Sequence, residues 1–541
     1  MKKLAVLLLF GMTYRIVMSL CGVDGVDTGF CNTFYQVFFQ YPDANIFNFI
    51  YYLLGLLGAL WEEYFGQFGL LGFRVLEAFT LTGAIFILCL TFKDCMSKRQ
   101  LYMAIILSMA FPTIFVTFHY NTLSFLLVAT ATCFFKKALT SDNAYWLLLS
   151  GVAIGTSLFV RIVNGTLLAL LAVPLTYYWC KGDRSLAVKK AGVMFVGVLS
   201  GIILMLGIML CLGQQTYYMS ALGEAFSTFQ GSGATHSHGH LISRYFGSII
   251  NVVLQMAAIV ALYYAYLYSK TLRKIWRGVT LVLLTSLFVI LTYLSLPYLT
   301  AMALSILLMA YFLKQTSGVE PMKATVSFLL LASLLYPFGS DIGMQGVFHW
   351  CAGLLIFPAV WCAGQLPVAK SKGALIIAYF SILACAVGKT VFSVYGEDES
   401  RFSCTTQIQS DRLNVFTTAE KAARYEKTIK AINRHLGGKR LLFVTNQASE
   451  LYYATRALPY EGHVQPVIYL GDRLVWRLDE RLSHFKEYPL IVMLNQERPS
   501  AETPEVQEIT ARWMTKQSYR LVYDDGNMKL YKPLKTIDEH E

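Results

Sequence analysis

Apolar segments that are long enough to cross a lipid bilayer place the strongest constraint on the fold of this chain. A helix needs about 20 mainly apolar residues to cross the hydrocarbon layer. Segments of this kind occur at residues 4–20, 72–92, 101–118, 122–135, 145–160, 165–180, 191–212, 246–268, 279–296, 299–313, 324–338, 346–365 and 374–392. The sequence therefore predicts an α-helical polytopic membrane protein with about 13 transmembrane helices.

Charged residues divide the chain into two parts of different composition. The first 396 residues contain 36 charged residues, whereas the 145 residues from 397 to 541 contain 42. A soluble globular protein has about a quarter of its residues charged, so only the second part has a soluble composition. We therefore predict a transmembrane domain at 1–395 and a soluble α/β domain at 396–541.

The pattern of the C-terminal part alternates between helix and strand. Apolar periodicity predicts helices over 418–436, 449–458, 472–485 and 504–517. Buried strands are expected at 440–445 and 489–494, and a hairpin turns across 524–527. No glycine-rich phosphate loop or metal motif stands out there, so the sequence assigns this domain no chemistry of its own.

The distribution of lysine and arginine predicts the topology. If the N-terminus is cytoplasmic, the cytoplasmic loops hold 19 of the 24 Lys and Arg residues in the first part, as the positive-inside rule requires. Counting the apolar stretch 46–61 as a span would invert this pattern, so we expect an interfacial helix there. An odd number of spans then places the C-terminal domain outside the cytoplasm. A bacterial inner membrane with a periplasmic C-terminal domain is the simplest compartment that fits. The pI of 9.0 reflects these loops and does not indicate nucleic-acid binding.

Five cations remain outside the predicted cytoplasmic loops. They lie near the outer ends of spans or in outer loops, at Arg15, Arg74, Arg161, Arg244 and Lys389. An ionisable group at membrane depth is costly, so a cluster that faces one aqueous cavity indicates a functional site. A salt bridge along one helix face, such as Arg74 with Glu77 three residues later, is the alternative.

The first outer loop contains two carboxylates among glycines, Asp24 and Asp27. A carboxylate at the membrane surface can accept a proton from a sugar hydroxyl or hold a divalent cation. An Asx-turn or a helix cap is the structural alternative, and it applies more strongly to Asp24 than to Asp27.

Three other outer segments contain polar candidates. Alternating histidines precede Arg244 in the long loop 213–245. His238, His240 and Arg244 could contact a phosphate or a sugar. The alternatives are that the histidines bind a metal or that the segment is an ordinary loop. The turn 118–122 carries the hydrogen-bonding side chains of His119 and Asn121. Asp341, in the turn 339–343, either binds an acceptor or caps the next helix.

The order of several loose motifs resembles the GT-C superfamily of polyprenyl-phosphate-dependent glycosyltransferases. The nearest branch contains the protein O-mannosyltransferases and aminoarabinose transferases. The motifs span residues 1–180: a short first span, Asp27, Tyr41-Pro42, an interfacial apolar stretch, Tyr64-Phe65-Gly66, Gly72-Phe73-Arg74, and a glycine-rich span from Gly151 to Arg161. The chain departs from the mannosyltransferases because Thr28 follows Asp27, where they have an adjacent Asp-Glu pair.

The resemblance implies a sugar donor linked to a polyprenyl phosphate or diphosphate, and a periplasmic glycan, lipid or protein as acceptor. Asp27, with Asp24 second, would be the base for an inverting transfer. The donor phosphate would contact Arg244, Arg161, Lys389, His240, His238 and Arg74. The acceptor would contact Asp341, His119, Asn121 and Tyr41. Any cofactor would be a divalent cation, Mg²⁺ or Mn²⁺.

Two other functions fit an outer-leaflet membrane protein. A transporter or flippase of a lipid-linked saccharide should repeat its span pattern in two halves, whereas here the acids concentrate in the first loop. An oligosaccharide polymerase or ligase would more often use a large loop late in the chain that contains arginine. The first-loop aspartates therefore favour the transferase.

Overall fold

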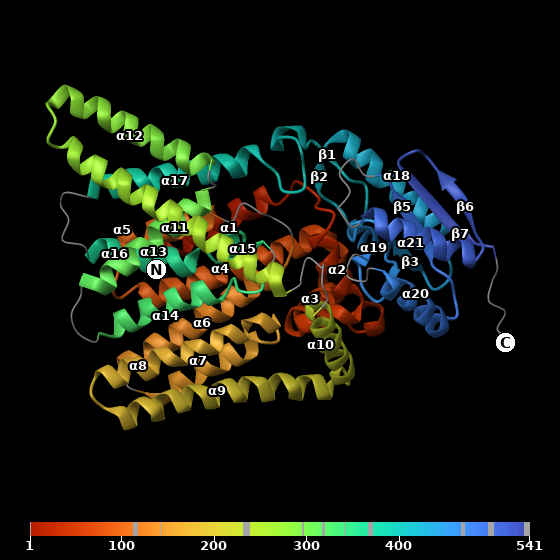
Figure 1. Cartoon of the computed structure of the whole chain (residues 1–541), viewed down its shortest axis with the longest axis horizontal. Helices are drawn as coiled ribbons and strands as arrows, with labels where there is room; N and C mark the ends of the chain where they lie inside the picture. Colours follow the sequence, from red (N-terminus) through yellow and green to blue (C-terminus); the bar gives the residue numbers. More distant parts are fainter. Residues whose placement is uncertain are drawn as a thin grey trace.

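The computed structural model describes residues 2–111, 117–141, 143–230, 238–294, 297–315, 320–340, 342–365, 372–466, 471–495 and 503–534. Helices form an elongated bundle, and a small domain with a β-sheet closes one end of it (Figure 1). We call this end of the bundle the sheet end and the small domain the sheet domain.

The bundle is built from helices of widely different length. They are α1 (Lys2–Met18), α4 (Gly69–Phe92), α5 (Lys98–Ala110), α6 (Tyr120–Ser141), α7 (Ala144–Ser157), η3 (Ile162–Leu171), α8 (Ala172–Cys180), α9 (Arg184–Cys211), α11 (His238–Ser269), α12 (Lys274–Leu294), α13 (Pro297–Gln315), α14 (Pro321–Leu335), α15 (Gly343–Cys351), α16 (Gly353–Gln365) and α17 (Lys372–Phe392). Shorter elements lie at the sheet end (Figure 1), namely α2 (Asp27–Val37), η1 (Pro42–Tyr51), α3 (Tyr52–Phe65), η2 (Gly66–Phe68) and α10 (Gln215–Gln230).

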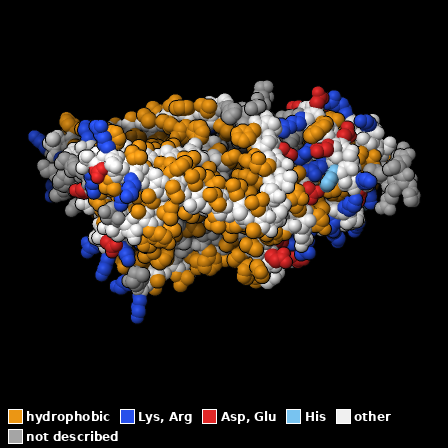
Figure 2. Space-filling view, turned by 90° about the horizontal axis from the view of Figure 1, so that it is seen from below, with side chains coloured by type: hydrophobic (Ala, Val, Ile, Leu, Met, Phe, Trp, Pro, Cys, Tyr) orange, Lys and Arg blue, Asp and Glu red, His pale blue; other side chains and the backbone are white. Residues whose placement is uncertain are grey.

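The described part of the chain is a multi-pass membrane protein by the length and composition of its helices. Eight segments are long and apolar enough to cross a membrane, and the shorter apolar helices α7, α14 and α16 accompany them. The sequence predicts about 13 spans, but α1 has only 17 residues and α5 only 13. Figure 2 shows a band of hydrophobic side chains over the bundle, with lysine and arginine at the end away from the sheet domain and also over the sheet domain, where Asp and Glu accompany them.

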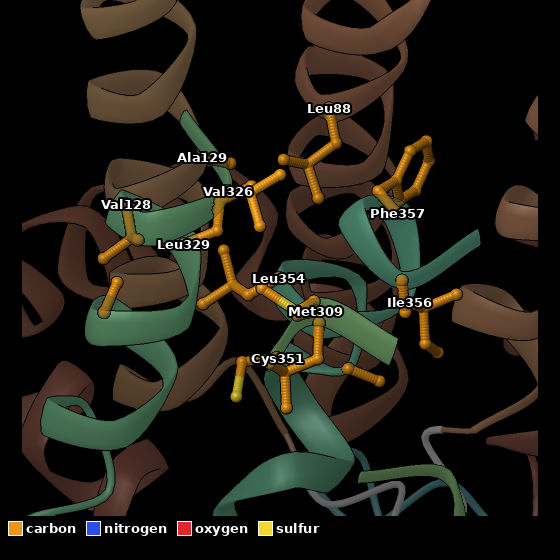
Figure 3. Close-up of a cluster of buried hydrophobic side chains, with 14 of the residues drawn as sticks. Leu88, Val128, Ala129, Met309, Val326, Leu329, Cys351, Leu354, Ile356 and Phe357 are labelled. Atoms are coloured by element: carbon orange, nitrogen blue, oxygen red, sulfur yellow. The ribbon is translucent and has the colours of Figure 1, made fainter. Parts of the chain in front are cut away.

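The core of the bundle is apolar and draws on helices far apart in the sequence. Leu88 of α4, Val128 of α6, Met309 of α13, Leu329 of α14 and Leu354 of α16 all belong to one buried cluster (Figure 3). The predicted span 346–365 is divided here into α15 and α16.

The segment between α1 and α4 begins and ends at the same side of the bundle. The amide of Gly22 donates to the carbonyl of Phe416 at 2.8 Å, and the amide of Leu70 donates to the carbonyl of Arg412 at 2.8 Å. Both ends of the segment therefore contact one short stretch of the sheet domain, so residues 23–69 make no net crossing. This geometry agrees with the predicted interfacial helix at 46–61, whose depth in the bilayer stays a prediction.

The sheet domain contains the elements that its sequence pattern predicts. Its helices are α18 (Ala419–His435), α19 (Glu450–Thr455), α20 (Asp472–Phe485) and α21 (Thr503–Lys516), with a short η4 (Arg401–Ser403). Its strands are β1 (Thr406–Gln407), β2 (Phe416–Thr417), β3 (Leu441–Val444), β4 (Leu458–Pro459), β5 (Leu490–Leu494), β6 (Tyr519–Asp524) and β7 (Met528–Pro533). The predicted helices, strands and hairpin are thereby confirmed, while the boundary at 395/396 stays a prediction.

The main sheet of this domain is mixed, with both parallel and antiparallel strand pairs. Its order is β4-β3-β5-β7-β6, with β3 parallel to both β4 and β5, and β7 antiparallel to β5 and β6. Asn446, just after β3, accepts from the amide of Leu494 at 2.8 Å and donates to its carbonyl at 2.9 Å. The carboxyl ends of β3 and β5 are thereby joined at one edge of the sheet.

Close packing of α7 on α9 depends on glycine. A β-carbon at Gly155 would lie 2.1 Å from the carbonyl oxygen of Val198, whereas one at Gly192 of α9 would meet nothing within 4 Å. We expect Gly155→Val to lower the free energy of unfolding by about 1–3 kcal/mol, because the helices must move apart. Gly192→Val is the matched control. Thermal unfolding of both variants in detergent measures the effect, and equal midpoints would contradict this packing.

Candidate functional site

The first loop, which we define as residues 19–26, leads from α1 into α2 and is fixed by Asp24. One carboxylate oxygen of Asp24 accepts from the amides of Val26 at 3.1 Å and Thr28 at 3.0 Å, and the other accepts from the Thr28 hydroxyl. Asp24 is buried, with 6% of its surface exposed. These bonds cap the start of α2, which is the structural alternative that the sequence leaves open for this residue.

Arg74 of α4 holds the first loop from the side of the bundle. Its guanidinium donates to the backbone carbonyls of Ser19, of Cys21 at 3.3 Å and of Gly22 at 2.7 Å. These carbonyls lie just beyond the last residue of α1, where the backbone no longer forms helical hydrogen bonds, so Arg74 satisfies polar groups of the loop backbone. These contacts favour a structural role for Arg74, and its contact with a donor phosphate stays a prediction.

The sheet domain holds the same loop from the opposite side. Lys421 of α18 donates to the carbonyl of Val23 at 2.9 Å and lies 3.1 Å from a carboxylate oxygen of Glu397. That oxygen also accepts from the amide of Val23 at 3.2 Å. The amide of Ser449 donates to the carbonyl of Gly25 at 3.0 Å. The first loop is therefore enclosed between α4 and the sheet domain.

Asp27 is the first residue of α2, and its side chain is half-buried. The hydroxyl of Tyr395 donates to its Oδ2 at 3.4 Å. Tyr395 lies three residues beyond the end of α17. Both oxygens of Asp24 hold the loop, which is a structural role, and Asp27 remains the first candidate for the base. Its role as base stays a prediction.

The turn at 117–122 brings His119, Asn121 and Arg161 together, although the sequence assigned them to different substrates. The guanidinium of Arg161 donates to the side-chain carbonyl of Asn121 at 3.0 Å and lies over the ring of Tyr120 at 5.3 Å. The hydroxyl of Tyr336 donates to the backbone carbonyl of Asn121. Arg161 is 4% exposed, so this cation is held inside the protein by an amide and two neighbouring rings.

His119 is a neutral hydrogen-bonding group in this turn. Its ring stacks on Trp350 with 5.1 Å between centroids, and its Nδ1 accepts from the amide of Asn121 at 3.3 Å. Burial, together with the charge of Arg161, lowers the pKa of His119 to about 3. The imidazole therefore stays uncharged at neutral pH, and a neutral ring suits a contact with a hydroxyl group.

Helix α2 connects Asp27 to this turn. The hydroxyl of Thr117 donates to Asn32 of α2 at 2.6 Å, and the hydroxyl of Tyr35 donates to the carbonyl of Phe118 at 2.7 Å. Rings continue the connection, because Phe30 packs against Tyr51 at 5.7 Å and Tyr51 stacks on Tyr120 at 4.9 Å. Asp27 and the group formed by Arg161, Tyr120 and Asn121 are thus joined through one continuous set of contacts.

Lys389 lies in a different setting, an open groove between α12 and α17. The groove has a volume of about 730 Å³, and its lining includes Val289, Tyr293, Phe380 and Phe392. The ammonium of Lys389 lies 5.4 Å from the centre of the Tyr293 ring. An apolar groove with one cation near the sheet end suits a lipid that bears an anionic head group.

For the other predicted site residues, no contact with Asp27 is found within the part of the chain that the structure describes. Asp27 begins α2, whose 11 residues extend about 16 Å, and Tyr41 lies four residues beyond the other end of this helix. Arg244 is exposed on α11, and its Nε lies 3.4 Å from Nε2 of His240. Asp341 and the side chain of His238 lie outside the described residues. The roles of all five in binding stay predictions.

A metal site is not assembled by the residues that the structure describes. Within those ranges, no group of three or more His, Cys, Asp or Glu side chains is close enough to hold a metal ion. Asp24 directs both of its oxygens to the backbone and hydroxyl groups of residues 26–28. These residues alone do not fit a divalent cation, and we derive no step that uses one.

The sequence alone did not predict the contacts of three residues near the candidate site. Glu77 is 4% exposed and accepts from the hydroxyl of Thr122, and the sequence suggested only a salt bridge with Arg74. Tyr395 reaches Asp27, and Glu450 of α19 is buried beneath the loop. Glu450 is one of 21 acids in the C-terminal part, and no local pattern separates it from exposed ones, because the contact between the domains buries it.

The different contacts of Asp24 and Asp27 predict different effects on stability. Asp24→Ala removes the acceptor of two backbone amides, so we expect a loss of about 0.5–2 kcal/mol in the free energy of unfolding. Asp27→Asn keeps the shape of the side chain and removes none of the hydrogen bonds that Asp24 accepts. It should therefore change the free energy of unfolding by less than about 0.5 kcal/mol. Thermal unfolding of the purified variants separates the two, and a larger loss for Asp27→Asn would contradict this assignment.

Comparisons with known proteins show a likeness in structure. No protein-family profile and no curated protein sequence matches the chain. The oligosaccharyltransferase of Archaeoglobus fulgidus, crystallised with zinc and sulfate, is similar with a TM-score of 0.51 and 10% identity, over 97% of this chain and 73% of that chain. ArnT from Cupriavidus metallidurans, bound to undecaprenyl phosphate, aligns over 98% of both chains with 12% identity and a TM-score of 0.41. The first of these likenesses shows the fold alone, and by it the chain has the GT-C fold that its sequence motifs predict.

Proposed function

We propose that this protein is a membrane glycosyltransferase that moves a sugar from a polyprenyl phosphate or diphosphate to a hydroxyl group of an acceptor. The observation that carries the proposal is the position of Asp27, at the sheet end of a GT-C-like bundle and hydrogen-bonded to Tyr395 just beyond α17. The same helix lines the apolar groove that ends near Lys389.

The groove supports a lipid-linked donor. Its apolar side chains would contact a polyprenyl chain, since burial of hydrocarbon is favourable wherever water is displaced. Lys389 is the cation among the described lining residues, and it would contact the phosphate. Tyr395 lies six positions after Lys389, so the two α-carbons can be at most about 20 Å apart. A sugar on that phosphate would therefore lie between Lys389 and Asp27.

The proposed reaction is a substitution at the anomeric carbon of the donor sugar. The acceptor oxygen forms a bond to that carbon as the bond to the phosphate oxygen breaks, and the phosphate leaves with the electron pair. The proton of the acceptor hydroxyl passes to Asp27. Negative charge grows on the leaving phosphate, so a nearby cation stabilises the transition state. Lys389 is the first candidate, and Arg161 and Arg244 remain candidates for other contacts with the donor.

The proposal also includes the membrane and the orientation of the chain in it. The presence of lysine and arginine at the end away from the sheet domain (Figure 2) supports a cytoplasmic position for that end. We therefore place the chain in the inner membrane of a bacterium, with the sheet domain and Asp27 on the periplasmic side. The acceptor would be a periplasmic glycan, lipid or protein.

Replacing the base tests the proposed activity. Asp27→Asn keeps the size of the side chain and removes the proton acceptor, so we expect transfer to fall by about 10²–10⁴-fold with unchanged expression. The measurement is release of polyprenyl phosphate by purified protein in nanodiscs, supplied with a set of polyprenyl-phosphate-linked sugars and an envelope extract as acceptor. Asp411→Asn, an exposed change at the same end of the molecule, is the control. Undiminished turnover of Asp27→Asn would remove Asp27 from the chemistry.

Replacing the groove cation tests the donor site. A hydrogen bond to a charged group contributes about 1.5–3 kcal/mol, so we expect Lys389→Gln to raise KM for the lipid donor by about 10-fold to 100-fold. Lys389→Arg should retain part of the affinity because it keeps the charge. Lys98→Gln, at the exposed start of α5, removes a charge elsewhere and should have no effect. An unchanged KM in Lys389→Gln would exclude this groove as the phosphate site.

A further inference from the structure

We propose that the sheet domain completes the active site, with Glu450 as a positioning residue that holds the first loop so that Asp27 keeps its place. This inference rests on the proposed function. It gives the C-terminal domain a role in catalysis that neither its sequence nor its fold assigns.

The start of α19 packs directly on the start of α2. A β-carbon at Gly29 would lie 2.0 Å from the backbone nitrogen of Glu450, so this approach requires glycine. The hydroxyl of Ser449 donates to the carbonyl of Val26 at 2.6 Å. Together with the bond from the Ser449 amide to Gly25, these contacts fix the backbone on both sides of Asp27.

The side chain of Glu450 lies beneath the first loop. It is 3% exposed, and its Oε1 accepts from the hydroxyl of Tyr425 at 2.9 Å. A β-carbon at Gly25 would lie 3.6 Å from Oε2, which has no hydrogen-bond partner among the described residues. Glu450 also lines a cleft of about 370 Å³, with Gly25 and Val26 on its other side. The carboxyl group thus supports the loop from the sheet domain.

The charges around Glu450 favour its neutral form. Burial, with the charge of Asp24 as a further cause, raises the pKa of Glu450 to about 8, although Tyr425 and Lys421 act in the opposite direction. The titratable and charged groups that face it or line its cleft are Asp24 from the first loop, Lys421, Arg424 and Tyr425 from α18, and Asp398 from the segment after α17. Asp24 accepts hydrogen bonds from two amides and a hydroxyl, so both of its oxygens act as acceptors beside Glu450.

Ionisation of Glu450 would place a second negative charge beneath the loop beside Asp24. A carboxyl group whose pKa rises on burial stabilises the contact fully at low pH and loses that contribution as the pH rises through the raised pKa. The contact of the sheet domain with the loop should therefore weaken as the pH rises through about 8. Asp27 is three residues from Asp24, so a shifted loop moves the base, and a misplacement of about 1 Å can cost about 10²-fold in rate.

Two substitutions of Glu450 test this role in the full-length protein in nanodiscs. Glu450→Gln keeps the shape and the neutral charge, so we expect wild-type turnover at pH 7 and loss of the decline in kcat above pH 8. Glu450→Ala removes the support, so we expect kcat to fall by about 10–100-fold while KM for the donor stays unchanged. Hydrogen–deuterium exchange of the peptide 20–35 should rise in Glu450→Ala only.

The control is Glu508→Ala, which changes an exposed glutamate of α21. Unchanged exchange of the β5 peptide in Glu450→Ala shows that the domain is folded. Wild-type exchange and turnover in Glu450→Ala would overturn the proposal. A Glu450→Gln variant as inactive as Glu450→Ala, with the loop in place, would also overturn it, because Glu450 would then transfer a proton itself. If the wild type transfers no sugar, the proposed function fails, and the exchange of peptide 20–35 still decides whether Glu450 holds the loop.

Discussion

Enclosure of the first loop between Arg74 and the sheet domain is the interaction on which the candidate site depends. The loop follows the end of a membrane helix, where backbone carbonyls lack partners. An unpaired polar group is unfavourable where water is excluded, and Arg74 donates hydrogen bonds to three carbonyls of the loop. On the other face, Lys421 and Ser449 bond to the same short stretch. The backbone before Asp27 therefore has little freedom to move.

This enclosure also explains why a soluble domain follows a membrane bundle. Residues 412–416 contact both the end of α1 and the start of α4, and Arg401 donates to the carbonyls of Met18 at 2.7 Å and Thr390 at 3.0 Å. The end of α1, the start of α4 and the end of α17 thus all contact residues 401–416 of the sheet domain. Tyr395, in the connection between the two, donates to Asp27. The sheet domain acts as a structural part of the site.

Sequence reasoning succeeded where local pattern determines structure. The amphipathic helix from Asp472 to Phe485 and the hairpin across 524–527 were predicted closely, because their periodicity and turn residues are local. The GT-C fold followed from the order of motifs around Asp27 and Arg74. The number of spans stays a prediction, because the length and hydropathy of a shorter apolar helix do not show whether it crosses the membrane.

The arrangement of the site could be predicted only in part. The positions of Asp24 and Asp27 after the first span are visible in the sequence, but their division into a cap and a base candidate depends on bonds to Thr28 and Tyr395. Arg161 and Asn121 were assigned separately to donor and acceptor, and a hydrogen bond joins them. Glu450 was missed because contacts between residues more than 400 positions apart bury it. Such contacts leave no periodic signal in one sequence.

The most direct test of this account is a cryo-electron microscopy structure of the protein in nanodiscs that contain a polyprenyl phosphate. We predict density for the lipid chain along the groove between α12 and α17, with the phosphate within about 4 Å of the Lys389 ammonium and the space toward Asp27 open for a sugar. A phosphate bound elsewhere, such as at the exposed Arg244 or at the end of the bundle away from the sheet domain, with this groove empty, would contradict the account.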